Sequence, residues 1–191
     1  MDLGLDQYRT AYVSFSAEIN VTTCEHLIAT CMNIVREGYN ELYFLFSTPG
    51  GSVMHGMNIY NVLRALPARL TFHNVGNVDS IGNAIFLAGD VRLACPHSTF
   101  MFHGVGMDVP SGVRLEQKNS QEILEGILAD QTRIASILTE HTALDAADAR
   151  DLFKEARTKD SAYALANRII SDVRDVHIPP GAATFSFVFQ R

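Results

Sequence analysis

The sequence predicts an α/β fold built from repeated β-α-β units around a mostly parallel sheet. Strand-like apolar segments alternate with segments of helical periodicity through the first half of the chain. Residues 116–141, which lack proline, then show one long helical pattern that would project as a handle. No linker or low-complexity tract interrupts the chain. We therefore expect a single domain over residues 1–191, with a head of about 1–115 and 142–191.

The first β-α-β unit is visible in the side-chain pattern. Residues 11–16 alternate apolar and polar, which is typical of a half-buried strand. A helix is expected from Thr22, with Glu25 completing a capping box, to a stop at Gly38. Residues 42–46 form a continuous apolar run, which suits a strand of a parallel sheet covered on both faces.

The same order repeats after the turn at Pro49-Gly50-Gly51. The elements expected next are a helix that Pro67 ends, a strand at 70–75, a helix from near Ser80 to Gly89, and short strands at 91–94 and 99–102. Beyond the long helix we expect a helix capped near Asp145 that runs through Arg157, a short helix from Ser161, and a strand-like tail at 183–189. The alternating phenylalanines of this tail need a sheet edge or another subunit to cover them.

Composition excludes several classes of protein. The formal charge of −6 argues against a general electrostatic affinity for nucleic acid. No apolar run approaches the roughly 20 residues of a membrane span, and the first residues do not resemble a signal peptide. Cys24 and Cys31 are seven residues apart, on one helix face, and are interpreted as buried thiols. We therefore expect a cytoplasmic protein without a membrane or nucleic-acid partner.

Three segments carry the chemistry. Ser80 lies where a strand ends and a helix begins, His103 follows an apolar strand, and Gly50-Gly51 follow the preceding strand. Because the carboxyl ends of parallel strands meet at one sheet edge, we expect these segments to lie together. They would supply a hydroxyl nucleophile, an imidazole base, and the amides of Gly51 and Ile81 as oxyanion donors, which together suit acyl transfer.

Each of these residues also has a purely structural interpretation. Ser80 could cap the helix that follows it, and His103 could be a hydrogen-bonded core residue. The histidines show no metal-ligand spacing such as His-Glu-x-x-His, and the glycines lack the Gly-Lys-Ser/Thr of a phosphate loop. We therefore expect neither a metal nor a cofactor.

Three motifs, at Ser47 to Val53, Gly76 to Gly82 and Pro96 to His103, closely resemble the proteolytic subunit of Clp proteases in order and spacing. The resemblance implies a ClpP/crotonase-like fold with the long helix as the handle that joins rings. It implies a serine-type endopeptidase with Ser80 as nucleophile, His103 as general base, and Gly51 and Ile81 as oxyanion-hole donors. It further implies protein or peptide substrates, homo-oligomeric rings (a heptamer or a tetradecamer), and an AAA+ unfoldase that uses ATP.

The third member of the triad departs from this family. The family places an aspartate a few residues before a Ser-Ala or Thr-Ala dipeptide. Here that position holds Arg157 when the chain is aligned on Ser161-Ala162, and Ala156 when it is aligned on Glu140-His141-Thr142. Asp160 is the nearest aspartate, and it would either orient His103 or only cap the last helix. Asp79 and Asn83, on either side of Ser80, also stand where the family has small residues.

Three functions therefore remain under consideration. The first is a serine endopeptidase of the Clp type. The second is a non-catalytic or weakly active scaffold subunit, for which the displaced Asp160 is the argument. The third is a crotonase-type enzyme acting on acyl-coenzyme A, which shares the paired oxyanion amides but has no further support in the sequence.

Overall fold

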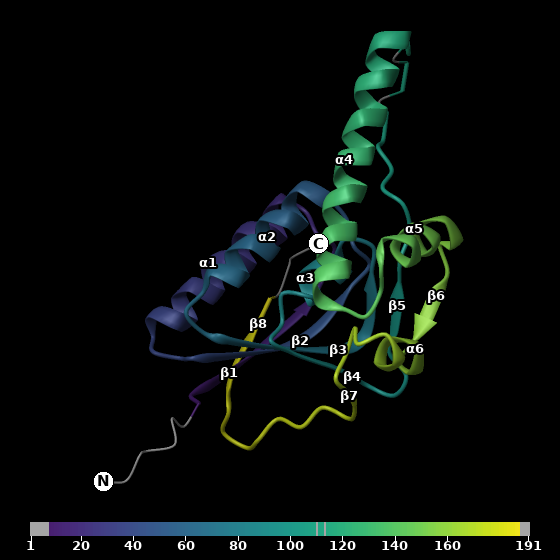
Figure 1. Ribbon diagram of the computed structural model, residues 1–191. Helices are drawn as coiled ribbons and strands as arrows, with labels where there is room; N and C mark the ends of the chain where they lie inside the picture. The colour runs from purple at the N-terminus through teal and green to yellow at the C-terminus, as the bar shows by residue number, and fades with distance from the viewer. Residues whose placement is uncertain (1–7, 110, 113, 188–191) are drawn as a thin grey trace.

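The computed structural model describes residues 8–187 except 110 and 113 (Figure 1). Strands and helices alternate through the first half of the chain, as predicted. In chain order the elements are β1 (Thr10–Ser16), α1 (Val21–Arg36), β2 (Glu41–Thr48), α2 (Val53–Ala65), β3 (Arg69–Asp79), α3 (Gly82–Phe86), β4 (Val91–Ala94), β5 (Thr99–Met101), α4 (Gln117–His141), α5 (Ala146–Glu155), β6 (Thr158–Asp160), α6 (Ser161–Ala166), β7 (Asp172–Val173) and β8 (Ala183–Ser186).

One sheet organises the fold. Its strand order is β6-β5-β3-β2-β1-β8, and β4 pairs with both β3 and β7. The described pairings are parallel apart from β5 with β6, which is antiparallel. The predicted α/β class is therefore confirmed. The strands β6 and β7 are too short to leave a periodic pattern, and the sequence did not predict them.

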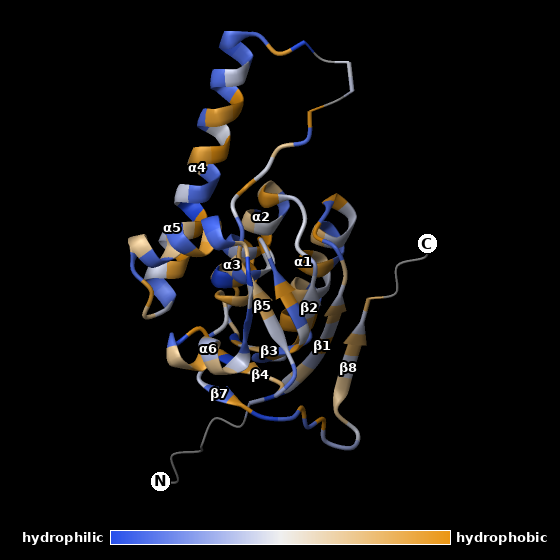
Figure 2. Cartoon of the chain, turned by 90° about the vertical axis from the view of Figure 1, so that its right-hand side faces the viewer, coloured by the Kyte–Doolittle hydropathy of each residue, from blue (hydrophilic) through white to orange (hydrophobic). Residues whose placement is uncertain are grey.

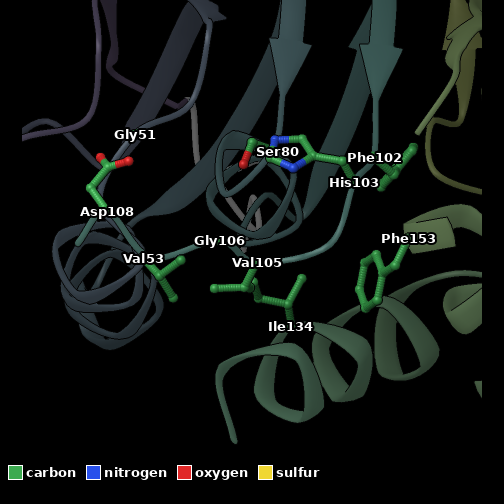
Figure 3. A pocket seen from close by; sticks show the side chains of 10 residues that line it. All are labelled: Gly51, Val53, Ser80, Phe102, His103, Val105, Gly106, Asp108, Ile134 and Phe153. Carbon is green, nitrogen blue, oxygen red and sulfur yellow. The ribbon is translucent and has the colours of Figure 1, made fainter. Parts of the chain in front are cut away.

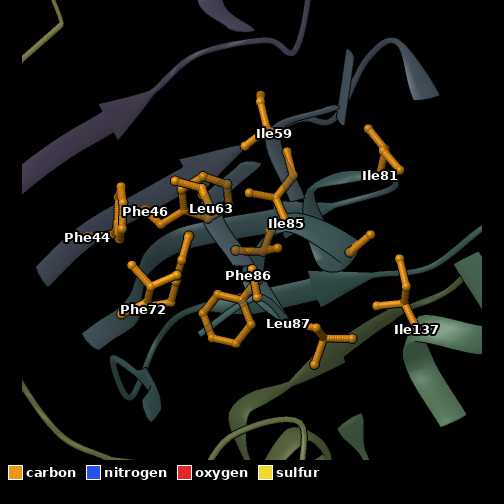
Figure 4. Packing of buried hydrophobic residues seen from close by; sticks show 14 of the residues in the cluster. Phe44, Phe46, Ile59, Leu63, Phe72, Ile81, Ile85, Phe86, Leu87 and Ile137 are labelled. Carbon is orange, nitrogen blue, oxygen red and sulfur yellow. The ribbon is translucent and has the colours of Figure 1, made fainter. Parts of the chain in front are cut away.

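The core lies where aromatic side chains of neighbouring strands meet α3. Phe44 of β2 stacks on Phe72 of β3 with ring centroids 4.4 Å apart, and Phe86 of α3 packs edge-on against Phe72 (Figure 4). Within β2 the odd and even positions differ, because Leu42, Phe44 and Phe46 are fully buried while the alternate side chains are partly exposed. The expected cover on both faces is therefore complete on one face and partial on the other.

Two helices begin at residues other than those predicted. Helix α1 begins one residue earlier than expected, and its capping box joins Asn20 to Thr23, not Thr22 to Glu25. Asn20 is extended, so its side-chain oxygen can accept from the Thr23 amide, at 3.0 Å. Helix α3 begins at Gly82, with Ile81 as its N-cap and no side-chain cap. Ser80 therefore does not cap a helix.

The long helix α4 projects beyond the sheet, and the segment that follows β5 runs outward to the far end of this helix (Figures 1 and 2). Its last turns pack on the core through Ile134, Ile137 and Leu138. Farther out, the apolar side chains Leu124 and Leu128 are 48% and 52% exposed. The predicted protruding helix is thus confirmed. No helix in the part of the chain that the structure describes is long and apolar enough to cross a membrane.

The tail covers a sheet edge, which is one of the two predicted solutions. Strand β8 pairs in parallel with β1, with Val13 opposite Phe185. Phe187 lies 6.0 Å from Phe15, centroid to centroid. Part of the predicted tail strand, residues 188 and 189, lies outside the described residues.

Candidate active site

Ser80 follows the last residue of β3 and adopts a conformation that few non-glycine residues adopt. Its φ is +56°, in the left-handed region. Its amide donates to the Met101 carbonyl, at 2.8 Å, which fixes the end of β3 against the end of β5. Strained backbone that is held by its surroundings is common at functional sites, because it presents a side chain that regular structure would turn away.

His103 reaches Ser80 because of the register between β3 and β5. These parallel strands place Asp79 opposite Met101, so the residues that follow each strand emerge at the same sheet edge. Figure 3 shows the Ser80 side chain beside the imidazole ring of His103. The imidazole Nδ1 lies 2.7 Å from the Gly104 carbonyl oxygen. A carbonyl can only accept, so Nδ1 carries the proton and Nε2 of the neutral ring is a free base.

A pocket of about 220 Å³ contains both side chains. Its wall is mainly apolar and comes from five separate segments of the chain (Figure 3). The lining residues are Gly51, Val53, Ser80, Phe102, His103, Val105, Gly106, Asp108, Ile134 and Phe153. Asp108 lies across the pocket from Phe153 and is the one carboxylate among them. A concave, mainly apolar site with a few polar groups is the usual form of a substrate site.

The turn at Gly50-Gly51 packs so closely against Ser80 and Ile19 that neither glycine has room for a side chain. Both glycines have positive φ, +89° and +142°. A Cβ added to Gly50 would lie 2.6 Å from the Ser80 Cβ, and one added to Gly51 would lie 2.2 Å from the Ile19 carbonyl oxygen. Glycine is therefore required at both positions for steric reasons.

Two backbone amides are available near the nucleophile. Within the described residues, neither the Gly51 nor the Ile81 amide donates a hydrogen bond. The Gly50 carbonyl and the Ser52 amide are instead engaged by Ile19, each at 2.8 Å. Gly51 lines the pocket, whereas Ile81 is fully buried and directly follows Ser80. Unpaired amides beside a nucleophile are what an oxyanion hole requires.

The structure does not bring Asp160 to His103. The Asp160 carboxylate accepts from the Tyr163 amide at 2.8 Å and caps α6. In the β5–β6 ladder Asp160 stands opposite Thr99, and it lines a different pocket from the one that contains His103. Of the two roles that the sequence left open, the geometry supports the helix cap. The Asp79 carboxylate is likewise engaged, since the Asn77 amide group donates to it at 2.7 Å.

Sequence reasoning missed most of the pocket wall. Val105, Ile134 and Phe153 come from the segment after β5, from α4 and from α5, and no motif links them. Ile134 lies in the helix expected over residues 116–141, but the sequence did not indicate that it reaches the pocket. The signal that could have been used for Asp108 is its place shortly after His103, on the strand edge where ligands bind.

Outside the pocket, burial shifts the pKa of two side chains in the interior. Burial raises the pKa of the Cys31 thiol to about 12, so this cysteine is inert, as expected for a buried helix face. Burial also lowers the pKa of His73, whose ring bonds Tyr43 at 2.8 Å and the Arg174 carbonyl at 2.9 Å. No group of histidine, cysteine or acidic side chains suited to a metal occurs within the described residues.

Comparisons with known proteins place the chain in a family. Residues 4–174 match the Clp protease family. An ATP-dependent Clp protease proteolytic subunit from Chlorella vulgaris is 26% identical over 185 residues, which cover 91% of this chain and 88% of that protein. The ATP-dependent Clp protease proteolytic subunit 2 from Prochlorococcus marinus is 27% identical over 161 residues, which cover 81% of this chain and 79% of that protein. The subunit from Vitis vinifera is 30% identical over half of each chain. The resemblance seen in the three motifs is confirmed, and the chain belongs to the Clp protease family.

Proposed function

We propose that the chain is a serine-type endopeptidase that hydrolyses peptide bonds of unfolded proteins or peptides through an acyl-enzyme. The observation that carries the proposal is the shared pocket of Ser80 and His103, beside the unpaired amide of Gly51. In the first step, Nε2 of His103 takes the Ser80 hydroxyl proton while Oγ attacks the substrate carbonyl carbon. The Gly51 and Ile81 amides then stabilise the oxyanion.

The second half of the reaction returns the proton. The His103 imidazolium donates it to the leaving amine, and the C–N bond breaks to leave an ester on Ser80. Water, deprotonated by the same imidazole, then hydrolyses that ester. In this scheme the Gly104 carbonyl replaces a carboxylate in holding the Nδ1–H tautomer. It fixes the orientation of the ring but brings no full negative charge to stabilise the imidazolium.

The partners follow from family membership and from surface features. The exposed Leu124 and Leu128 on α4 would be covered by a second copy of the chain, in homo-oligomeric rings. Substrates would be delivered by an AAA+ unfoldase, because the matched relatives are named ATP-dependent. The three free cysteines favour a reducing compartment such as the cytoplasm.

A fluorophosphonate probe tests the proposal directly. Such a probe phosphonylates an activated serine, and we expect mass spectrometry to locate the adduct on Ser80. Ser80→Ala should abolish the adduct, whereas Ser136→Ala, on the exposed face of α4, should keep it. The proposal would be refuted if the folded wild-type protein, tested alone, is not labelled by the probe and does not cleave fluorogenic peptides.

That negative result would favour the second candidate, a non-catalytic scaffold subunit. The specific observation behind it is that no carboxylate is bound to His103 among the described residues. A scaffold would assemble into rings with an active subunit without labelling at Ser80, so sizing of the mixture combined with the probe separates the two functions.

A further inference from the structure

Asn83 carries a buried side-chain amide three residues after the proposed nucleophile, Ser80. It lies in the second position of α3 and is 1% exposed. Asparagine is rarely buried so completely in a helix unless its side chain has a defined polar task.

Both donors of this amide are used on the active site itself. The Asn83 Nδ2 donates to the Ser80 carbonyl at 3.1 Å and to the Met101 carbonyl at 2.9 Å. The Met101 carbonyl also accepts from the Ser80 amide, at 2.8 Å. The Asn83 side chain therefore joins the Ser80 carbonyl to Met101, on the strand that leads into His103, while the Ser80 amide bonds Met101 directly.

The other half of the amide is left without a partner. Asn83 Oδ1 is buried and makes no hydrogen bond within the described residues. An unpaired buried carbonyl oxygen lowers the stability of the folded state, and a small apolar side chain would avoid that loss. The chain thus keeps an arrangement that is unfavourable for stability, and the two donated bonds are what it gains.

The geometry points to Asn83 as a positioning residue that locks Ser80 in its left-handed conformation and holds it at the distance from His103 that proton transfer requires. The inference rests on the proposed function. A displacement of about 1 Å between reacting groups lowers rates about 100-fold, so loosening this contact has a large effect on chemistry. The apolar pocket wall is unaffected, so binding of a probe stays the same.

The test compares Asn83→Ala with Asn74→Ala, its matched control. Asn74 is also fully buried and also ties β3 to β5, through the Thr99 carbonyl at 2.8 Å, but within the described residues it makes no hydrogen bond to Ser80. For each variant the fluorophosphonate reaction is resolved into the inactivation rate constant and the probe dissociation constant, and the thermal midpoint is measured. We expect Asn83→Ala to lower the rate constant at least tenfold with an unchanged dissociation constant, while Asn74→Ala lowers the thermal midpoint and leaves the rate constant within twofold.

The contrary outcomes are distinct. The positioning role would be overturned if Asn83→Ala has the inactivation rate constant of the wild type. It would also be overturned if Asn74→Ala lowers that rate constant as much as Asn83→Ala does. Wild-type protein that does not label at Ser80 would overturn the proposed function, and this role with it. If Asn83→Ala does not fold, Asn83→Ser decides, since one donor in a smaller side chain should give an intermediate rate constant. A wild-type rate in the folded serine variant would contradict the inference.

Discussion

Gly50→Ala should inactivate the protein more than it unfolds it. An added Cβ at residue 50 would lie 2.6 Å from the Ser80 Cβ and 2.9 Å from the Asp79 carbonyl oxygen. Ordinary carbon–carbon contacts begin near 3.5 Å, so Ser80 or the turn must move by about 1 Å. A shift of that size between reacting groups lowers a rate about 100-fold. We therefore expect fluorophosphonate labelling of Ser80 to slow about 100-fold.

The stability loss is smaller and has two sources. A left-handed φ costs an alanine roughly 1–2 kcal/mol, and overpacking adds roughly 1–3 kcal/mol. Gly181→Ala is the matched control, because Gly181 has φ +78° with no atom within 4 Å of an added Cβ and lies before β8. Urea unfolding of Gly181→Ala should show a loss of roughly 1–2 kcal/mol in the free energy of unfolding, from the left-handed φ alone. Its Ser80 should be labelled at the wild-type rate. A folded Gly50→Ala protein that labels as fast as wild type would refute the close approach of this turn to Ser80.

Three further predictions concern single side chains. Asp160→Ala should lower the unfolding free energy by about 1 kcal/mol, through the lost cap, and leave the labelling rate of Ser80 within twofold. Asp108→Asn should reduce the preference for lysine over leucine in fluorogenic peptides by about two- to fivefold in kcat/KM, since an exposed ion pair is worth up to about 1 kcal/mol. His73→Gln should flatten the pH dependence of stability. Burial lowers the pKa of folded His73, so its contribution is complete above about pH 6.5 and is lost as the pH falls towards the lowered value.

Each of these has a control and a contrary outcome. Asp145→Ala removes the cap of α5 and should destabilise about as much as Asp160→Ala; a loss of labelling confined to the Asp160 variant would make that residue the orienting acid. Glu122→Gln, far out on α4, should leave peptide preference unchanged, and an unchanged preference in Asp108→Asn would exclude Asp108 from substrate selection. For stability, exposed His97→Gln should keep the wild-type slope between pH 5 and 8, and an equal slope in His73→Gln would contradict its assignment.

The sequence determined the fold class and the two side chains of the proposed nucleophile and base, because those depend on local order. Alternating periodicities specify parallel β-α-β units, and such units bring the ends of successive strands to one edge. Ser80 and His103 therefore had to meet once β3 and β5 were parallel neighbours, as Asp79 opposite Met101 now shows. Glycines at 50 and 51 marked a close backbone approach in the same way.

Tertiary structure decided what surrounds those residues. The position of Asp160 depends on the pairing of β6 with β5, which is too short to predict from the sequence. In the structure the Asp160 carboxylate accepts a hydrogen bond from the Tyr163 amide. The group that holds His103 is the Gly104 carbonyl, and every residue has a carbonyl, so no side-chain pattern could identify it. Asn83 looked like a replaced small residue until packing placed its amide between two carbonyls. Periodicity reports which face of an element is buried; partners across elements are set by the packing of segments distant in sequence.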